Sequence, residues 1–218
     1  LMQPTWLDTN DDGIADAIYA GDLKGNMWKF DVSSDDASRW AEAYGKPLYV
    51  AMDALSNMLP ITTAPVTRFH PGGGQVVVFG TGQSIFSGDF PDKARQHRVF
   101  GIWDKPSYAA DPATIPSGVT ELEQRTWSLD TNKPEAIVQS ATGAIDWSRK
   151  KGWYVNIPGS LASGMVLGNP KAMGKDVNIP IVYKKAAAEV MCADSGAGAD
   201  VQVNGVAGVA TTPNLFGI

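Results

Sequence analysis

The first acidic segment of the chain constrains its fold more than any other feature. Residues 8–16 read DTNDDGIAD, which places oxygen-bearing side chains at loop positions 1, 3, 5 and 9 and glycine at position 6. The same spacing occurs in the calcium loop of EF-hands, where position 7 contributes its backbone carbonyl. An EF-hand also needs a helix on each side of that loop. Residues 17–31 instead alternate around a glycine turn, which predicts a β-hairpin.

The side chains of this loop fit calcium better than they fit a simple turn. Calcium takes oxygen ligands, and the loop supplies three carboxylates, one side-chain amide and one backbone carbonyl. Turn capping explains single Asp and Asn residues in a loop. It does not explain three acids held together, because carboxylates repel one another without a cation. We therefore predict a Ca²⁺ site with the ligands Asp8, Asn10, Asp12, Ile14 and Asp16.

The predicted site is weaker than an EF-hand site. Position 12 of the loop is Tyr19, where an EF-hand has a bidentate Glu. Water or another carboxylate must replace that ligand. Asp22 and Asp31 are near in the sequence, but both are expected to cap turns. We expect reversible binding with a Kd between roughly 10⁻⁴ and 10⁻⁶ M.

Composition limits the class of protein. The chain has 218 residues, of which 44% are hydrophobic, and its 23 Gly and 14 Pro favour many short strands joined by tight turns. A net charge of -5 without a basic cluster argues against nucleic-acid binding. No apolar run reaches the roughly 18 residues of a membrane span. The chain begins at Leu1 almost directly with a strand signal, so we interpret it as a fragment of a longer protein.

A unit of strand, glycine-rich turn and strand recurs along the chain. It occurs at 18–31 and again at 76–104, and both copies end in an aromatic residue followed by Asp. Helix signals are limited to 36–44 and 184–191. Repeated sheet units of this kind predict an all-β partial β-propeller. At roughly 40 to 50 residues per blade, the chain would hold about three to four blades.

Other residues with functional chemistry have plainer explanations. The strand tryptophans are expected in the core: Trp28, Trp103, Trp127 and Trp153. His70 and His97 lie in predicted loops without a converging nucleophile, so we expect both at the surface. The loop acids Asp89, Asp92 and Asp111 form no spaced pair. Residues 72–74 (GGG) precede a strand, which predicts a hairpin turn and not a phosphate loop. No catalytic residue is predicted.

Several segments together resemble the C-terminal domain of the PilY family, the type IV pilus biogenesis proteins and tip-associated adhesins. The most specific segment is 8–31 (DTNDDGIADAIYAGDLKGNMWKFD). Five further segments follow in the same order: PITTAP at 60–65, VFGTG at 78–82, FGIWD at 100–104, GWY at 152–154 and VLGNP at 166–170. The resemblance covers residues 1–170; within the remaining part, 171–218, the chain departs from the family pattern at 184–189 (KKAAAE).

The resemblance implies a modified propeller in which one calcium ion, bound in such a loop, regulates pilus extension and retraction, twitching motility and surface attachment. It implies a non-enzymatic protein exported to the pilus tip, cell surface, or periplasm and outer membrane of a Gram-negative bacterium. The implied partners are pilin or minor pilins and host or abiotic surfaces. One alternative is a quinoprotein-type dehydrogenase, although a chain with only Cys192 lacks the vicinal cysteine pair of those enzymes. Another is a cell-surface repeat protein that uses calcium only for stability.

Overall fold

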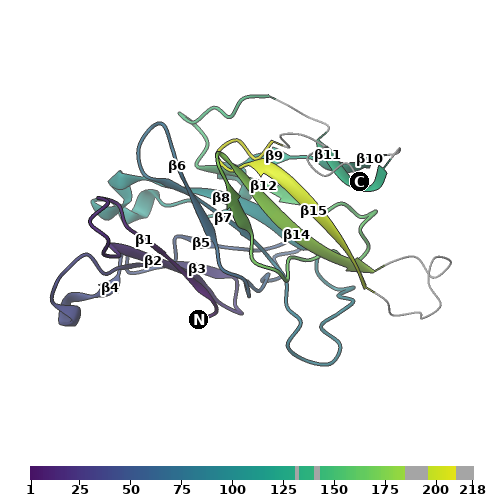
Figure 1. Cartoon of the computed structure of the whole chain (residues 1–218), viewed down its shortest axis with the longest axis horizontal. Coiled ribbons are helices and arrows are strands. Elements are labelled where there is room, and N and C mark those ends of the chain that lie inside the picture. The colour runs from purple at the N-terminus through teal and green to yellow at the C-terminus, as the bar shows by residue number, and fades with distance from the viewer. Residues whose placement is uncertain (131–132, 140–142, 185–195, 210–218) are drawn as a thin grey trace.

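The computed structural model describes residues 1–130, 133–139, 143–184 and 196–209 (Figure 1). Within these ranges the chain is built from strands, which confirms the all-β prediction. Helix is limited to short 3₁₀ turns: η1 (Ala37–Arg39), η2 (Pro106–Ala109), η3 (Pro112–Thr114) and η4 (Val119–Glu121). The first of these lies in the helix signal at 36–44. In the second signal Lys184 ends a strand, and residues 185–191 lie outside the described ranges. Of the described helices, none is long and apolar enough to cross a membrane.

The strands within the described ranges form four sheets. The first contains β1 (Pro4–Leu7), β2 (Ala17–Gly21), β3 (Asn26–Asp31) and β4 (Ala41–Glu42), with β5 (Tyr49–Val50) also paired to β3. The second has the order β6 (Val66–Phe69), β7 (Gln75–Gly80), β8 (Arg98–Asp104), β12 (Gly152–Asn156) and β9 (Glu123–Arg125). The third has the order β13 (Lys171–Met173), β14 (Asp176–Lys184) and β15 (Gly196–Asn204). The fourth pairs β10 (Trp127–Asp130) with β11 (Lys133–Gln139).

The predicted hairpins are present. Strands β2 and β3 pair antiparallel from Ala17 opposite Asp31 to Gly21 opposite Met27, directly after the acidic loop. Strands β7 and β8 also pair antiparallel, as the repeat predicts. The glycines at 72–74 form the turn between β6 and β7, where the His70 N–H donates to the Gly74 carbonyl at 3.0 Å. The expected number of blades, about three to four, stays a prediction.

The second sheet is the centre of the fold because both of its faces are buried. In β7, Val76 and Val78 pack in one core with residues of the third sheet. Val77 and Phe79 alternate with them and pack in a second core with residues of the first sheet. All seven residues of β8 are buried for the same reason. The first and third sheets therefore pack on opposite faces of the second sheet. A strand that is buried on both faces has a continuous run of apolar residues in its sequence.

The tryptophan prediction is largely confirmed. Trp103, Trp127 and Trp153 are buried, and Trp153 is completely inaccessible. Trp28 is half-buried, and its indole N–H donates to Asp22 at 3.0 Å.

Candidate functional site

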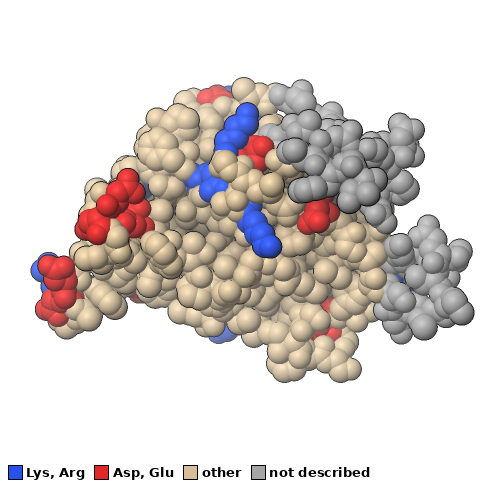
Figure 2. Space-filling view, viewed as in Figure 1, with Lys and Arg blue, Asp and Glu red and all other residues tan. Residues whose placement is uncertain are grey.

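Residues 8–16 form an exposed loop between β1 and β2. The base of the loop is closed by backbone hydrogen bonds from the Asp16 N–H to the Leu7 carbonyl (2.8 Å) and from the Val32 N–H to the Asp16 carbonyl (2.9 Å). The loop is therefore attached to the end of β1, the start of β2 and the end of β3. Acidic side chains gather on the surface where Figure 1 places this loop (Figure 2).

The first three predicted side-chain ligands fold back onto the backbone of the loop. Asp8 accepts the Gly13 N–H at 2.7 Å, Asn10 accepts the Asp12 N–H at 3.0 Å, and Asp12 accepts the Ile14 N–H at 2.8 Å. The bond from Gly13 is the largest influence on Asp8 and holds the pKa of its carboxyl below the ordinary value. Glycine suits position 6 because its φ is +86°, a conformation that other residues adopt at a cost.

The last predicted side-chain ligand, Asp16, is bound to a neighbour within the loop. Its Oδ2 accepts the Thr9 N–H at 2.7 Å and also the Thr9 hydroxyl. Across the described part of the chain, no three His, Cys, Asp or Glu side chains converge as a metal site requires. The donor set nevertheless fits calcium chemically, since all five predicted ligands offer oxygen within one closed loop. Asp16 would meet the ion through Oδ1, or through Oδ2 after releasing Thr9.

The two nearby acids cap turns, as predicted. Asp22 accepts the backbone N–H of Asn26 at 2.9 Å, its side-chain amide at 2.8 Å and the Trp28 indole. Asp31 accepts the Ser33 N–H at 3.0 Å and its hydroxyl at 2.6 Å. Both carboxylates are therefore bound within their own hairpins.

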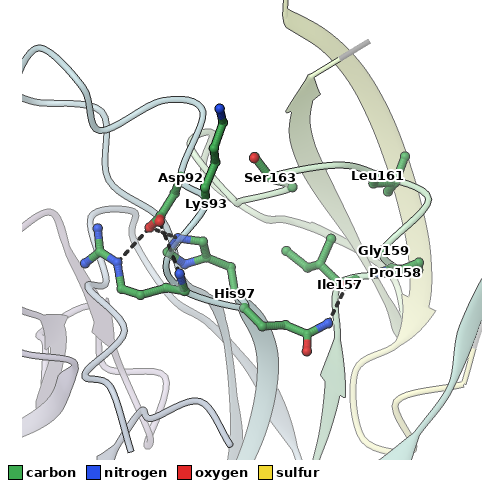
Figure 3. Close-up of a pocket in the computed structure, with 11 residues that line it drawn as sticks. Asp92, Lys93, His97, Ile157, Pro158, Gly159, Leu161 and Ser163 are labelled. Carbon is green, nitrogen blue, oxygen red and sulfur yellow. Dashed lines mark hydrogen bonds and ion pairs between the residues drawn. The ribbon is translucent and has the colours of Figure 1, made fainter. Parts of the chain in front are cut away.

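A second polar site lies between the loop that joins β7 to β8 and the loop after β12. It surrounds a cavity of about 290 Å³, with Asp92 and His97 on one side and Ile157 and Ser163 on the other (Figure 3). The expectation of a surface His97 is wrong, because the residue is only 2% exposed. Its Nε2 lies 3.1 Å from Asp92 Oδ2, which also accepts the Arg95 Nε–H at 2.7 Å. Burial is the largest influence and lowers the pKa of His97, although Asp92 opposes it.

The expectation of a surface His70 is also wrong. This residue is 3% exposed, and its ring stacks on Trp103 with centroids 3.8 Å apart. Both histidines follow loop-like sequence, and only their packing partners reveal the burial. The sequence feature that came nearest to predicting the burial of His97 was its short spacing from Asp92 and Arg95. The three residues form one hydrogen-bonded cluster.

The cluster around His97 does not form a nucleophilic triad. Thr81 Oγ1 lies 3.1 Å from His97 Nδ1. The same hydroxyl oxygen accepts the Arg98 N–H at 2.9 Å and lies 3.1 Å from the Arg98 carbonyl. Its hydrogen-bonding capacity is therefore used to fasten the start of β8, and the cluster supports the loop structurally.

Comparisons with known proteins agree with the fold. Residues 1–136 match the family model of the PilY1 beta-propeller domain. The type IV pilus biogenesis factor PilY1 of Pseudomonas aeruginosa PAO1 is 31% identical over 210 residues, covering 81% of this chain and 18% of the relative. A type IV pilus biogenesis factor PilY1 homolog of Xylella fastidiosa is 32% identical over 158 residues, covering 69% of this chain and 10% of the relative.

A solved structure matches as well. The crystal structure of the Pseudomonas aeruginosa PilY1 C-terminal domain superposes with a TM-score of 0.79 at 26% identity, covering 95% of this chain and 47% of that one. The chain spans about a fifth or less of the length of these curated relatives. Because the family model matches more than half of the residues, the chain belongs to the PilY1 beta-propeller domain family.

Proposed function

We propose that the chain is a calcium-binding propeller segment of a type IV pilus assembly protein and adhesin. In this proposal calcium regulates pilus extension and retraction, twitching motility and surface attachment. The protein acts outside the cytoplasm, at the pilus tip, cell surface or periplasm, and contacts pilin or minor pilins. Support comes from the family membership and from relatives that are named type IV pilus biogenesis factors.

The observation that carries the calcium part is the attachment of the acidic loop to three strand ends. Hydrogen bonds join Asp16 to Leu7 and to Val32, so a change in the loop reaches β1, β2 and β3 together. Without a cation, Asp8, Asp12 and Asp16 repel one another. A bound calcium ion would supply the positive charge that removes this repulsion. The loop would then hold one geometry at this edge of the first sheet, as in other charge-driven local switches.

Calorimetric titration with calcium tests the site directly. Asp8→Ala and Asp16→Ala each remove a ligand carboxylate, so we expect the Kd to rise about tenfold or more. Asp11→Asn is the matched control, because Asp11 lies in the same loop outside the ligand set and Asn tolerates its φ of +61°. We expect the control to bind like the wild type. Unchanged binding in both alanine variants would contradict the site.

The regulatory part needs the full-length protein in its own bacterium. We expect Asp16→Ala to alter pilus display and twitching, and Asp16→Lys to mimic a loop that holds its cation permanently. Wild-type behaviour of both strains would refute calcium regulation. If calcium raised the melting temperature of the protein while both strains kept normal pili, the ion would serve stability alone.

A further inference from the structure

The end of the sheets opposite the acidic loop carries exposed apolar side chains on separate turns. These turns are 22–25 between β2 and β3, 53–58 after β5, and 83–90 at the start of the loop between β7 and β8. Their exposed large apolar residues, called here the apolar tips, are Leu23, Leu55, Met58, Ile85 and Phe86. Leu55 is 81% exposed and Phe86 is 66% exposed, although a folded chain gains by burying such groups.

The three turns belong to one end of the molecule. The Ala51 N–H donates to the Gly25 carbonyl at 2.8 Å, which places the 53–58 turn beside the first hairpin. The Gly82 N–H donates to the Pro60 carbonyl at 2.8 Å, which places the start of the β7–β8 loop beside the end of that turn. This loop extends away from the sheets in Figure 1, on the side remote from the acidic loop. The three turns that carry the apolar tips therefore lie at one end of the molecule.

Each turn is held in shape by an aspartate. Asp22 begins the first turn, and its carboxylate accepts the backbone N–H groups two and four residues later in the chain. Asp53 begins the second turn and accepts the N–H groups at the same two spacings. Asp89 Oδ2 accepts the N–H groups of Ile85 and Phe86, both at 2.7 Å, so the two apolar side chains project from a fixed turn. Presentation on ordered turns lowers the entropy cost of docking.

The most exposed charged side chains of these turns and of the rest of the β7–β8 loop are lysines. The described aspartates of these segments, Asp22, Asp53, Asp89 and Asp92, are all buried or half-buried. Lys24 and Lys93 are exposed, and neither ammonium group forms an ion pair or hydrogen bond with a described residue. Lys24 adjoins one apolar tip in the sequence, and Lys93 lies at the base of the loop that carries two others. A partner at this end therefore meets apolar tips together with two ammonium groups that are unpaired among the described residues, while the carboxylates of Asp22 and Asp89 are turned to their own turns.

We propose that this end docks on a lipid surface with anionic headgroups. The tips are single side chains on separate turns, a form suited to entering a lipid interface and not to lining a groove for a peptide. Interfacial binding strength comes from the buried apolar area together with attraction between basic side chains and anionic lipids. Ile85 and Phe86 form the main insertion point, and Lys24 and Lys93 contact the headgroups. This proposal is independent of calcium, since the acidic loop lies at the other end.

Vesicle co-sedimentation of the full-length protein tests the proposal. The probes are vesicles of equal parts phosphatidylethanolamine and phosphatidylglycerol, and vesicles of phosphatidylcholine alone. We expect binding to the anionic vesicles, weaker binding to phosphatidylcholine, and a loss of about tenfold for Ile85→Ser combined with Phe86→Ser. Lys93→Glu should reduce binding to the anionic vesicles only.

The control is Phe69→Ser, because Phe69 is also exposed but pairs with Gln75 at the start of β7, at the opposite end of that strand from the β7–β8 loop. It should bind vesicles like the wild type, with or without a calcium chelator. Equal sedimentation of the wild type and the double variant, with both folded by circular dichroism, would overturn the proposal. A second result would also overturn it: the wild-type protein does not bind vesicles but binds an acidic protein partner, and the double variant loses that binding.

Discussion

The imidazole of His97 lies between Asp92 and Thr81, and that of His70 lies between Trp103 and Trp147. Burial is the largest influence on both side chains and lowers both pKa values. The unfolded chain titrates its histidines near a pKa of about 6.5. Below that pH the unfolded state binds more protons than the folded state, so the free energy of unfolding falls.

We therefore expect the urea midpoint to be constant above about pH 7 and to fall between about pH 6.5 and 5. Replacing the only two histidines of the chain, as His70→Gln with His97→Gln, should flatten this region. Aspartates such as Asp53 and Asp92 have lowered pKa values although burial opposes the shift, so their contribution is lost only below about pH 4. A double variant that kept the full wild-type slope would contradict the assignment to histidine.

Two turns of the apolar end use the same local design. Residues 22–26 (DLKGN) and 53–57 (DALSN) each begin with an aspartate that caps the turn and end with an asparagine whose amide reaches back to that aspartate. The fourth position is left-handed in both, with φ of +80° at Gly25 and +65° at Ser56. Glycine adopts this conformation freely, whereas serine is strained.

The two turns should respond in opposite directions to substitution at the fourth position. At Gly25 an added Cβ would lie 2.7 Å from the Ala51 carbonyl oxygen and 2.8 Å from that of Leu59, so Gly25→Ala should cost about 2–4 kcal/mol. Ser56→Gly removes a strained side chain and should stabilise the fold by up to about 1 kcal/mol. Urea denaturation of both variants measures the two signs. If both variants shifted the urea midpoint in the same direction, the two turns would not share one backbone requirement at the fourth position.

At the scale of the whole molecule, Asp104 joins the first and second sheets. It ends β8, is only 3% exposed, and accepts the Tyr19 hydroxyl at 2.6 Å and the Tyr44 hydroxyl at 2.5 Å. The Lys29 ammonium lies 2.8 Å from the same carboxylate. The buried Asp104 carboxylate therefore connects β8 with β2 and β3, which are distant from it in the sequence.

Asp104→Asn should destabilise the whole fold by about 2–4 kcal/mol, because it leaves the Lys29 ammonium without its counter-charge in a largely buried position. Asp35→Asn is the control, since Asp35 is exposed and its loss should change stability by less than about 0.5 kcal/mol. Denaturant midpoints followed by tryptophan fluorescence measure both. If the two variants had the same midpoint, the buried connection would contribute nothing to stability.

Much of the fold was predictable because its signals are local. The β2–β3 and β7–β8 hairpins follow from alternation around glycine turns, and the capping role of Asp22 follows from its place before a turn. The same reasoning failed at His70 and His97. Loop sequence indicates exposure on average, but these side chains are buried by partners that the loop residues themselves do not specify.

By itself, the sequence determined the all-β class, the hairpins and the oxygen-rich chemistry of residues 8–16, because each depends on neighbours within a few residues. Only the tertiary structure decided that β7 is buried on both faces, that Asp104 binds Tyr19 and Lys29, and that the apolar tips share one end. Asp104 meets these partners across 85 and 75 residues of chain. Such contacts depend on how the sheets stack, and backbone preferences of individual segments do not encode that arrangement.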